Sequence, residues 1–175
     1  NFGLDRISLR DLSQNKNLAT HYIINIGMIR IVLSFLSFII YLILLFYNSN
    51  LHLPLILLGL SIFSSGLSLS YFARSMEFFK IISINQVLAS IFTISLYLIF
   101  VKSHSDFIYA ILIIVIVSLF TNILFLYNFK NYLKNIKNHI SITLIKSLIT
   151  SSFPLFLSSI MVAIYYFADT IMLGF

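Results

Sequence analysis

The chain has 175 residues, of which 60% are hydrophobic and only 9% are charged, and its mean hydropathy is +1.04. Soluble globular domains carry about 25% charged residues, so this composition excludes an ordinary soluble domain. It predicts an integral membrane protein of the all-α class, a polytopic bundle of transmembrane helices. Disulfides are excluded because the chain has no cysteine.

Five apolar segments are each close to the roughly 20 residues that a helix needs to cross a bilayer. They are Tyr22–Tyr47, Leu51–Phe72, Ile81–Val101, Phe107–Tyr127 and Leu148–Ile171. The predicted organisation is a polar segment at residues 1–21, four spans within 22–127, a basic loop at 128–147 and a fifth span within 148–175. Because the chain opens on Asn1 in a polar segment and stops just after a helix, we interpret it as an internal piece of a longer protein.

Lysine and arginine are distributed unequally between the predicted loops. Nine of them lie in alternate loops: Arg6, Arg10, Lys16, Arg74, Lys80, Lys130, Lys134, Lys137 and Lys146. The other two loops hold only Lys102. Cytoplasmic loops carry the basic excess, so the opening segment, Ala73–Lys80 and Asn128–Ser147 are predicted to be cytoplasmic. The net charge of +6 then reflects topology, and no nucleic-acid partner is expected.

The basic loop has a helical repeat of its own. Its apolar residues Phe129, Tyr132, Leu133, Ile136 and Ile140 recur every three or four positions, with lysines between them. This pattern is typical of an amphipathic helix lying on the lipid surface. A solvated loop with a few apolar contacts is the alternative.

Each of the first four spans presents one polar or small face. The stripes are Arg30, Ser34, Ser37 and Tyr41; Ser61, Ser65 and Ser68; Gln86, Ser90, Thr93 and Tyr97; and Ser118, Thr121 and Asn122. Such faces serve helix packing or line a hydrophilic cavity, and for the serine-rich second span packing is favoured. Arg30, Gln86 and Asn122 are costly in lipid, so they are candidates for a substrate path.

Two residues distinguish the last span, Ser151–Phe175. Pro154 removes a helical hydrogen bond and invites a kink. A polar line, Ser151, Ser158, Tyr165 and Asp169, runs down one side of the helix, so Tyr165 and Asp169 join the substrate-path candidates. The line is expected to turn toward partners or toward a pathway in a helix buried in the bundle. Asp169 is interpreted either as a proton or cation site or as the partner of another helix.

Arg30 lies about two turns into its predicted helix. It either snorkels back to the cytoplasmic headgroups or offers a fixed cation to an anionic ligand such as a phosphate. Arg74, Glu77 and Lys80 are spaced by three residues, which predicts a mutual set of ion pairs at the membrane surface or a cytoplasmic gate.

No enzyme signature is present, and neither a metal nor another cofactor is predicted. His21, His52, His104 and His139 are scattered over loops and span ends without the spacing of metal ligands. There is no glycine-rich phosphate loop and no nucleophile elbow.

Three stretches together carry a family resemblance. FGLDRISLRDLSQNK resembles the segment after the second helix of bacterial polysaccharide flippases, and SYFARSMEFFKIISINQVLASI resembles the junction of their fourth and fifth helices. SSFPLFLSSIMVAIYYFADTIMLGF resembles their seventh helix, where a serine or threonine near Pro-Leu and a late aspartate before Ile-Met-Leu-Gly are typical. These flippases belong to the MATE-like multidrug/oligosaccharidyl-lipid/polysaccharide exporter superfamily.

The resemblance implies a fragment, helices three to seven, of a larger transporter with two related halves around a central cavity. The implied function is translocation of oligosaccharide repeat units linked to undecaprenyl diphosphate across the bacterial plasma membrane, for surface polysaccharides such as O-antigen or capsule. Arg30 would contact the diphosphate and Asp169 would serve coupling or gating. Implied partners are the lipid-linked oligosaccharide, membrane lipids, and polysaccharide polymerase and chain-length proteins. A cation-coupled multidrug exporter and a non-transporting membrane scaffold of polysaccharide assembly are the alternatives.

Overall fold

A computed structural model of the chain describes residues 2–48, 52–103, 106–133 and 139–174. The described residues are helical without strands, which confirms the predicted all-α class. In chain order the helices are α1 (Leu4–Gln14), a 3-10 turn (Lys16–Leu18), α2 (Ala19–Asn48), α3 (His52–Leu67), α4 (Ser70–Ser75), α5 (Phe79–Phe100), α6 (Phe107–Phe129) and α8 (Ile142–Leu173). Five segments are long and apolar enough to cross a membrane, as predicted: Lys16–Leu45, Pro54–Ser75, Phe79–Phe100, Phe107–Phe129 and Ile142–Ala168.

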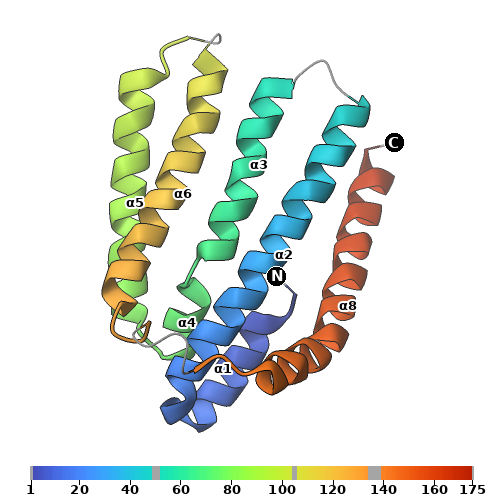
Figure 1. Ribbon diagram of the computed structural model, residues 1–175. Helices are drawn as coiled ribbons and strands as arrows, with labels where there is room; N and C mark the ends of the chain where they lie inside the picture. The colour runs from blue at the N-terminus through green and yellow to red at the C-terminus, as the bar shows by residue number, and fades with distance from the viewer. Residues whose placement is uncertain (1, 49–51, 104–105, 134–138, 175) are drawn as a thin grey trace.

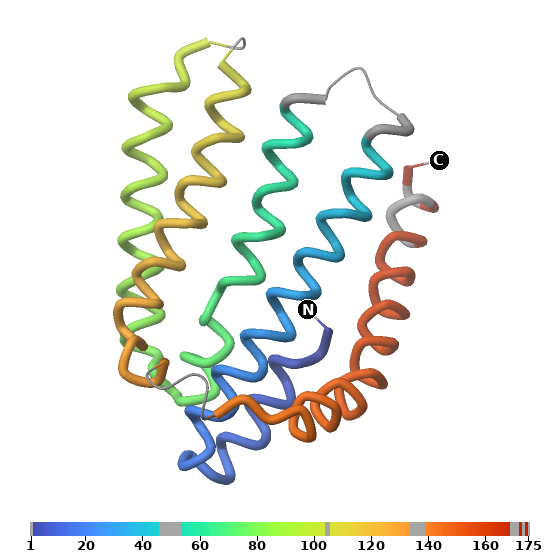
Figure 2. The backbone as a smooth tube through the Cα atoms, viewed as in Figure 1, coloured from blue at the N-terminus to red at the C-terminus, as the bar shows by residue number. Residues whose placement is uncertain are grey.

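The long helices α5, α6, α3 and α2 stand side by side, and α8 follows beside α2 (Figure 1). Helix α3 packs against both α2 and α6, and α5 packs against α6. The short helices α1 and α4 contact each other and lie below the middle of this row, at the lower ends of the long helices (Figure 2). The large apolar side chains that remain exposed along the long helices form the surface that lipid would cover.

Helix α1 lies in the opening segment, for which the sequence analysis predicted only a polar stretch. Leu4, Ile7, Ser8 and Leu12 are buried, so one face of α1 packs into the protein. The helix begins after Gly3, whose φ of +76° lies in the left-handed region that favours glycine. A Cβ there would lie 2.7 Å from the Leu155 Cβ of α8, so Gly3 permits a close approach of the two helices.

The hydrophobic core lies at the same end of the bundle, and aromatic rings dominate part of it. Phe72 of α4 packs edge-on against Phe129 and against Tyr132, with ring centroids 5.2 Å apart in both pairs. Residues 130–133 form turns, and Phe129 is buried in the core. The predicted surface helix is therefore wrong over these residues, because Tyr132 and Leu133 pack against the hydrophobic core. Lys134, Ile136 and Lys137 lie outside the described residues.

Helix α8 starts at Ile142, earlier than the predicted span, and its first part lies across the end of the bundle before the helix turns to run beside α2 (Figures 1 and 2). Pro154 lies inside it, and proline is the usual physical cause of such a bend.

The face of α8 that meets the rest of the chain carries Leu148, Ser152 and Leu155. The predicted polar line lies elsewhere, with Ser151, Ser158 and Tyr165 exposed. Among the described side chains of α8, those at Leu148, Ser152 and Leu155 are covered by the rest of this chain, and burial of the helix in a larger bundle stays a prediction. The side chain of Asp169 lies outside the described residues, although its backbone belongs to α8.

Candidate functional site

The second span is interrupted near one end, which the sequence did not predict. Helix α3 ends at Leu67 and α4 begins at Ser70, so Ser68 and Leu69 lie outside both helices. In a continuous helix the carbonyl of Ser64 would accept the N–H of Ser68. Here that N–H donates to the carbonyl of Ser65, 3.4 Å away. A carbonyl released inside a membrane protein needs another donor.

Two side chains from neighbouring helices donate to carbonyls at the interruption. Asn122 of α6 donates to the carbonyl of Ser64 at 2.6 Å and to its hydroxyl at 2.9 Å. Arg30 of α2 donates to the carbonyl of Ser65 at 3.0 Å. Two residues predicted to line a substrate path therefore also support the interruption between α3 and α4.

Arg30 is held on three sides within the bundle. Its guanidinium donates to Asp5 of α1 at 2.9 Å and lies over the Tyr71 ring, 4.7 Å from the centroid. Only 11% of its side chain is exposed. From the sequence, Arg30 was expected either to snorkel to the headgroups or to offer its charge to a ligand. Neither expectation included Asp5, whose carboxylate pairs with Arg30 in the structure.

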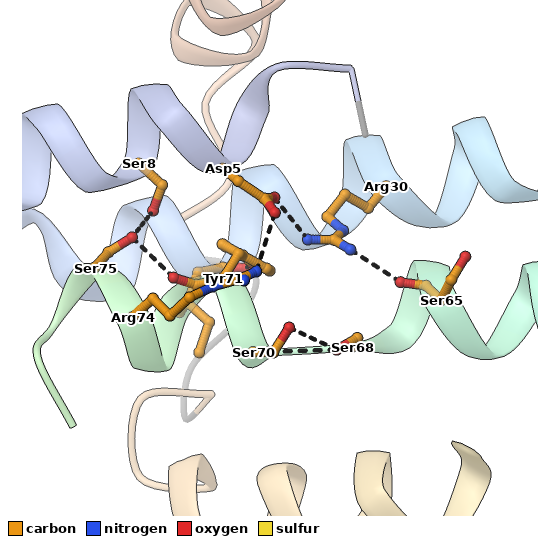
Figure 3. Close-up of polar contacts among 10 residues, drawn as sticks. Asp5, Ser8, Arg30, Ser65, Ser68, Ser70, Tyr71, Arg74 and Ser75 are labelled. Carbon is orange, nitrogen blue, oxygen red and sulfur yellow. Dashed lines mark hydrogen bonds and ion pairs between the residues drawn. The ribbon is translucent and has the colours of Figure 1, made fainter. Parts of the chain in front are cut away.

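Asp5 also joins Arg30 to a second arginine. Its other carboxylate oxygen accepts from Arg74 of α4 at 3.2 Å, so one carboxylate lies between two guanidinium groups (Figure 3). We call Asp5, Arg30 and Arg74 the arginine cluster; its formal charge is +1. A hydrogen bond of 2.8 Å between Ser8 and Ser75 fixes α1 against α4 beside it (Figure 3).

The predicted ion-pair set of Arg74, Glu77 and Lys80 does not form. Arg74 pairs with Asp5, and Glu77 pairs with Lys16 at 3.1 Å. The reason is the backbone, because Glu77 has a φ of +61° and the chain reverses there instead of continuing one helix. The three residues therefore do not share a helix face, and Lys80 is exposed near the start of α5.

A small cavity adjoins the arginine cluster between α1, α2 and α3. Its volume is about 110 Å³, and its polar lining comes from Asp5, Arg30, Ser34, Ser37 and Ser65, with Gly66 beside them. Ser34 and Ser37 belong to the predicted stripe of Arg30, so this stripe does face a polar hollow. Gly66 is also where α3 approaches the backbone carbonyl of Arg30 closely.

Three further predicted site residues, whose side chains the structure describes, lie away from the arginine cluster. Gln86 is exposed on α5, Tyr165 is exposed on α8, and Asn122 is buried against α3. Sequence reasoning missed Asp5, although the buried face of α1 was readable from the spacing of Leu4, Ile7 and Leu12.

His21 and His139 contact each other, although all four histidines were expected to be scattered. His139 Nδ1 lies 3.2 Å from His21 Nε2. Asn25, fully buried beside them, donates to the carbonyls of His21 and His139 and accepts from the N–H of Ser141. Among the described residues no three metal-ligating side chains come together. This contact thus joins α2 to the chain before α8.

Comparison with known proteins identifies the family. No curated protein and no solved structure matches the chain significantly. A family model described as "Polysaccharide biosynthesis protein" matches residues 1–175, the whole chain. The chain, a membrane protein with five apolar spans, therefore belongs to the polysaccharide biosynthesis protein family, a flippase family within the MATE-like exporter superfamily.

Proposed function

We propose that this protein takes part in moving oligosaccharide repeat units, linked to undecaprenyl diphosphate, across the bacterial plasma membrane for surface polysaccharide synthesis. Membership of the polysaccharide biosynthesis family and the five apolar spans support this proposal. The physical problem is that a diphosphate and sugars do not cross about 30 Å of hydrocarbon unaided. A transporter solves it by sheltering the head group while the lipid tail stays in the bilayer.

The observation that carries the proposal is the arginine cluster, where Arg30 and Arg74 converge on one carboxylate. Phosphate oxygens accept hydrogen bonds from guanidinium groups with the same fork geometry as a carboxylate. Asp5 thus acts as a stand-in for an anionic head group. In the proposed cycle a diphosphate displaces Asp5 and takes its place between the two arginines.

The basic loops favour placing the end that carries α1 and α4 on the cytoplasmic side. The arginine cluster then receives the head group from the cytoplasmic leaflet, and rocking of two transporter halves exposes it to the other side. Gln86, Tyr165 and Asp169 stay candidates for the path, with Asp169 in coupling or gating. Polysaccharide polymerase and chain-length proteins are the proposed partners that receive the product.

The test replaces Arg74 rather than Arg30, because Arg30 also supports the Ser65 carbonyl. In a strain lacking the full gene, plasmid-borne Arg74→Gln protein is expected to restore surface polysaccharide poorly at wild-type membrane levels. Arg10→Gln is the matched control, because Arg10 is a more exposed arginine that pairs with neighbouring Asp11. Equal export by the Arg74→Gln and Arg10→Gln proteins would overturn the assigned role of the cluster.

A further inference from the structure

A second and larger polar cavity lies on the other side of Arg74, between α4, α5 and α6. Its volume is about 330 Å³. Its polar lining comes from Ser68, Ser70, Arg74, Asn85, Gln86 and Thr121. A volume of this size exceeds what one water molecule needs. The interrupted backbone between α3 and α4 therefore borders a hollow that can hold a polar ligand, and lining a polar cavity is one of the settings in which irregular backbone is tolerated within a membrane.

Asn85 gives this cavity a specific chemistry. The residue is only 4% exposed, and its Nδ2 has no hydrogen-bond partner among the described residues. A buried amide donor without an acceptor is costly and rare in native folds. The Asn85 Nδ2 is thus a donor that an acceptor atom of a ligand bound in the cavity would satisfy.

The other polar groups of the lining also favour an acceptor with negative charge. Arg74 binds Asp5 through one nitrogen, and a guanidinium carries five N–H donors. Gln86 adds an exposed carboxamide on the same helix as Asn85. The described lining residues include a cation and no acidic side chain.

We propose that this cavity binds a phosphate group, with Asn85 Nδ2 and the Arg74 guanidinium donating to its oxygens. Arg74 and Gln86 reach the surface of the chain, so the ligand enters from outside the bundle. The phosphate comes either from a phospholipid headgroup beside the helices or from solution. This cavity differs from the one beside Arg30, although Arg74 belongs both to its lining and to the arginine cluster. Asn85 lies outside that cluster, so a test on Asn85 does not depend on the identity of the transported molecule.

The test uses the full-length protein in a neutral detergent with three probes: short-chain phosphatidylglycerol, diacylglycerol of the same chain length, and inorganic phosphate. Thermal unfolding and native mass spectrometry measure binding. We expect phosphatidylglycerol or inorganic phosphate to bind, and diacylglycerol, which lacks phosphate, not to bind. Binding of phosphatidylglycerol without binding of inorganic phosphate identifies a lipid headgroup as the source. Binding of inorganic phosphate without binding of phosphatidylglycerol identifies a soluble ligand.

The decisive variant is Asn85→Leu, which removes the unpartnered donor and keeps the branching of the side chain at Cγ. Its binding is expected to be roughly tenfold weaker, while its own unfolding temperature stays equal or rises because a buried donor without a partner is removed. Asn128→Leu is the control, because Asn128 is an exposed amide that donates to Leu124 of its own helix. Should Asn85→Leu fail to fold, Asn85→Asp keeps the size, places a carboxylate before the phosphate and is expected to abolish binding. Equal binding of phosphatidylglycerol and diacylglycerol, or undiminished binding by the Asn85 variant, would overturn the proposal.

Discussion

Asp5 decides how Arg30 can reside in an apolar bundle. A guanidinium taken out of water is stable only if an opposite charge and further acceptors surround it. Asp5, the Ser65 carbonyl and the Tyr71 ring provide this environment. The same carboxylate is shared with Arg74, so its loss would leave two cations facing each other.

We therefore predict that Asp5→Asn lowers the free energy of unfolding by about 2–3 kcal/mol, because Arg30 remains largely buried without its counter-charge. Thermal unfolding in detergent measures the effect. Glu77→Gln is the matched control: it removes a charge whose partner Lys16 is more than half exposed, as Glu77 is. Exposed pairs contribute about 0–1 kcal/mol. Equal losses for the two variants would contradict the described role of Asp5.

From the sequence the buried cation of this cluster was predictable, but its anionic partner was not. Arg30 was predictable because a charge inside an apolar run is conspicuous. Asp5 was not, because it lies in a polar stretch where a carboxylate attracts no notice. Likewise Arg74, Glu77 and Lys80 are spaced as on one helix, but the left-handed backbone at Glu77 breaks that helix. Spacing alone does not record such a reversal.

At the scale of the element, the interruption between α3 and α4 is stabilised from outside. Asn122 of α6 supplies a donor to the Ser64 carbonyl, and Arg30 of α2 supplies a second donor to the Ser65 carbonyl, which also accepts the N–H of Ser68. Five spans were predictable from hydropathy alone, because bilayer thickness sets their length. The interruption was not, because serine is tolerated in membrane helices and the local sequence lacks a proline.

Asn122→Leu is expected to destabilise the protein by about 1–3 kcal/mol, because it leaves the Ser64 carbonyl buried without a donor. Unfolding in detergent compares this variant with Ser118→Ala. The Ser118 hydroxyl donates to the Val115 carbonyl of its own helix, so its loss is expected to cost little. A stable Asn122→Leu protein would mean that the carbonyl finds another donor.

A substitution at Gly3 tests the close packing of α1 against α8. We expect Gly3→Ala to cost about 1–2 kcal/mol, because a left-handed φ is unfavourable for alanine and the added Cβ meets Leu155. Gly27→Ala is the contrasting control: its Cβ would only touch the Tyr71 hydroxyl at 3.9 Å. Inside a helix this change is expected to stabilise by up to about 1 kcal/mol. Thermal shifts of the same sign for the two variants would contradict this account of Gly3.

At the scale of the whole molecule, tertiary packing is concentrated at the end that holds α1 and α4. The aromatic cluster around Phe72 and Phe129 and the buried face of α1 lie there. Asn25 adds a link between distant parts of the chain, through hydrogen bonds to His21, His139 and Ser141. The sequence could not predict this link, because more than a hundred residues separate its partners.

Asn25→Ala removes those three hydrogen bonds, and we expect the chain before α8 to detach more readily from α2. The basic segment Asn128–Ser147 contains four lysines, so limited trypsin digestion reports its accessibility. Cleavage there is expected to become several-fold faster than in the wild type, because local opening follows the loss of local contacts. Asn128→Ala is the control within the same segment. Unchanged cleavage of Asn25→Ala would show that the link does not restrain α8.

The most direct measurement of the proposed function uses a strain that lacks the full gene. Surface polysaccharide and the leaflet distribution of lipid-linked repeat units are measured in the same cells. The proposed function predicts loss of surface polysaccharide together with repeat units accumulating on the cytoplasmic leaflet. Intact polysaccharide with new sensitivity to cationic drugs would contradict it in favour of a multidrug exporter, and a strain changed in neither respect would contradict transport altogether.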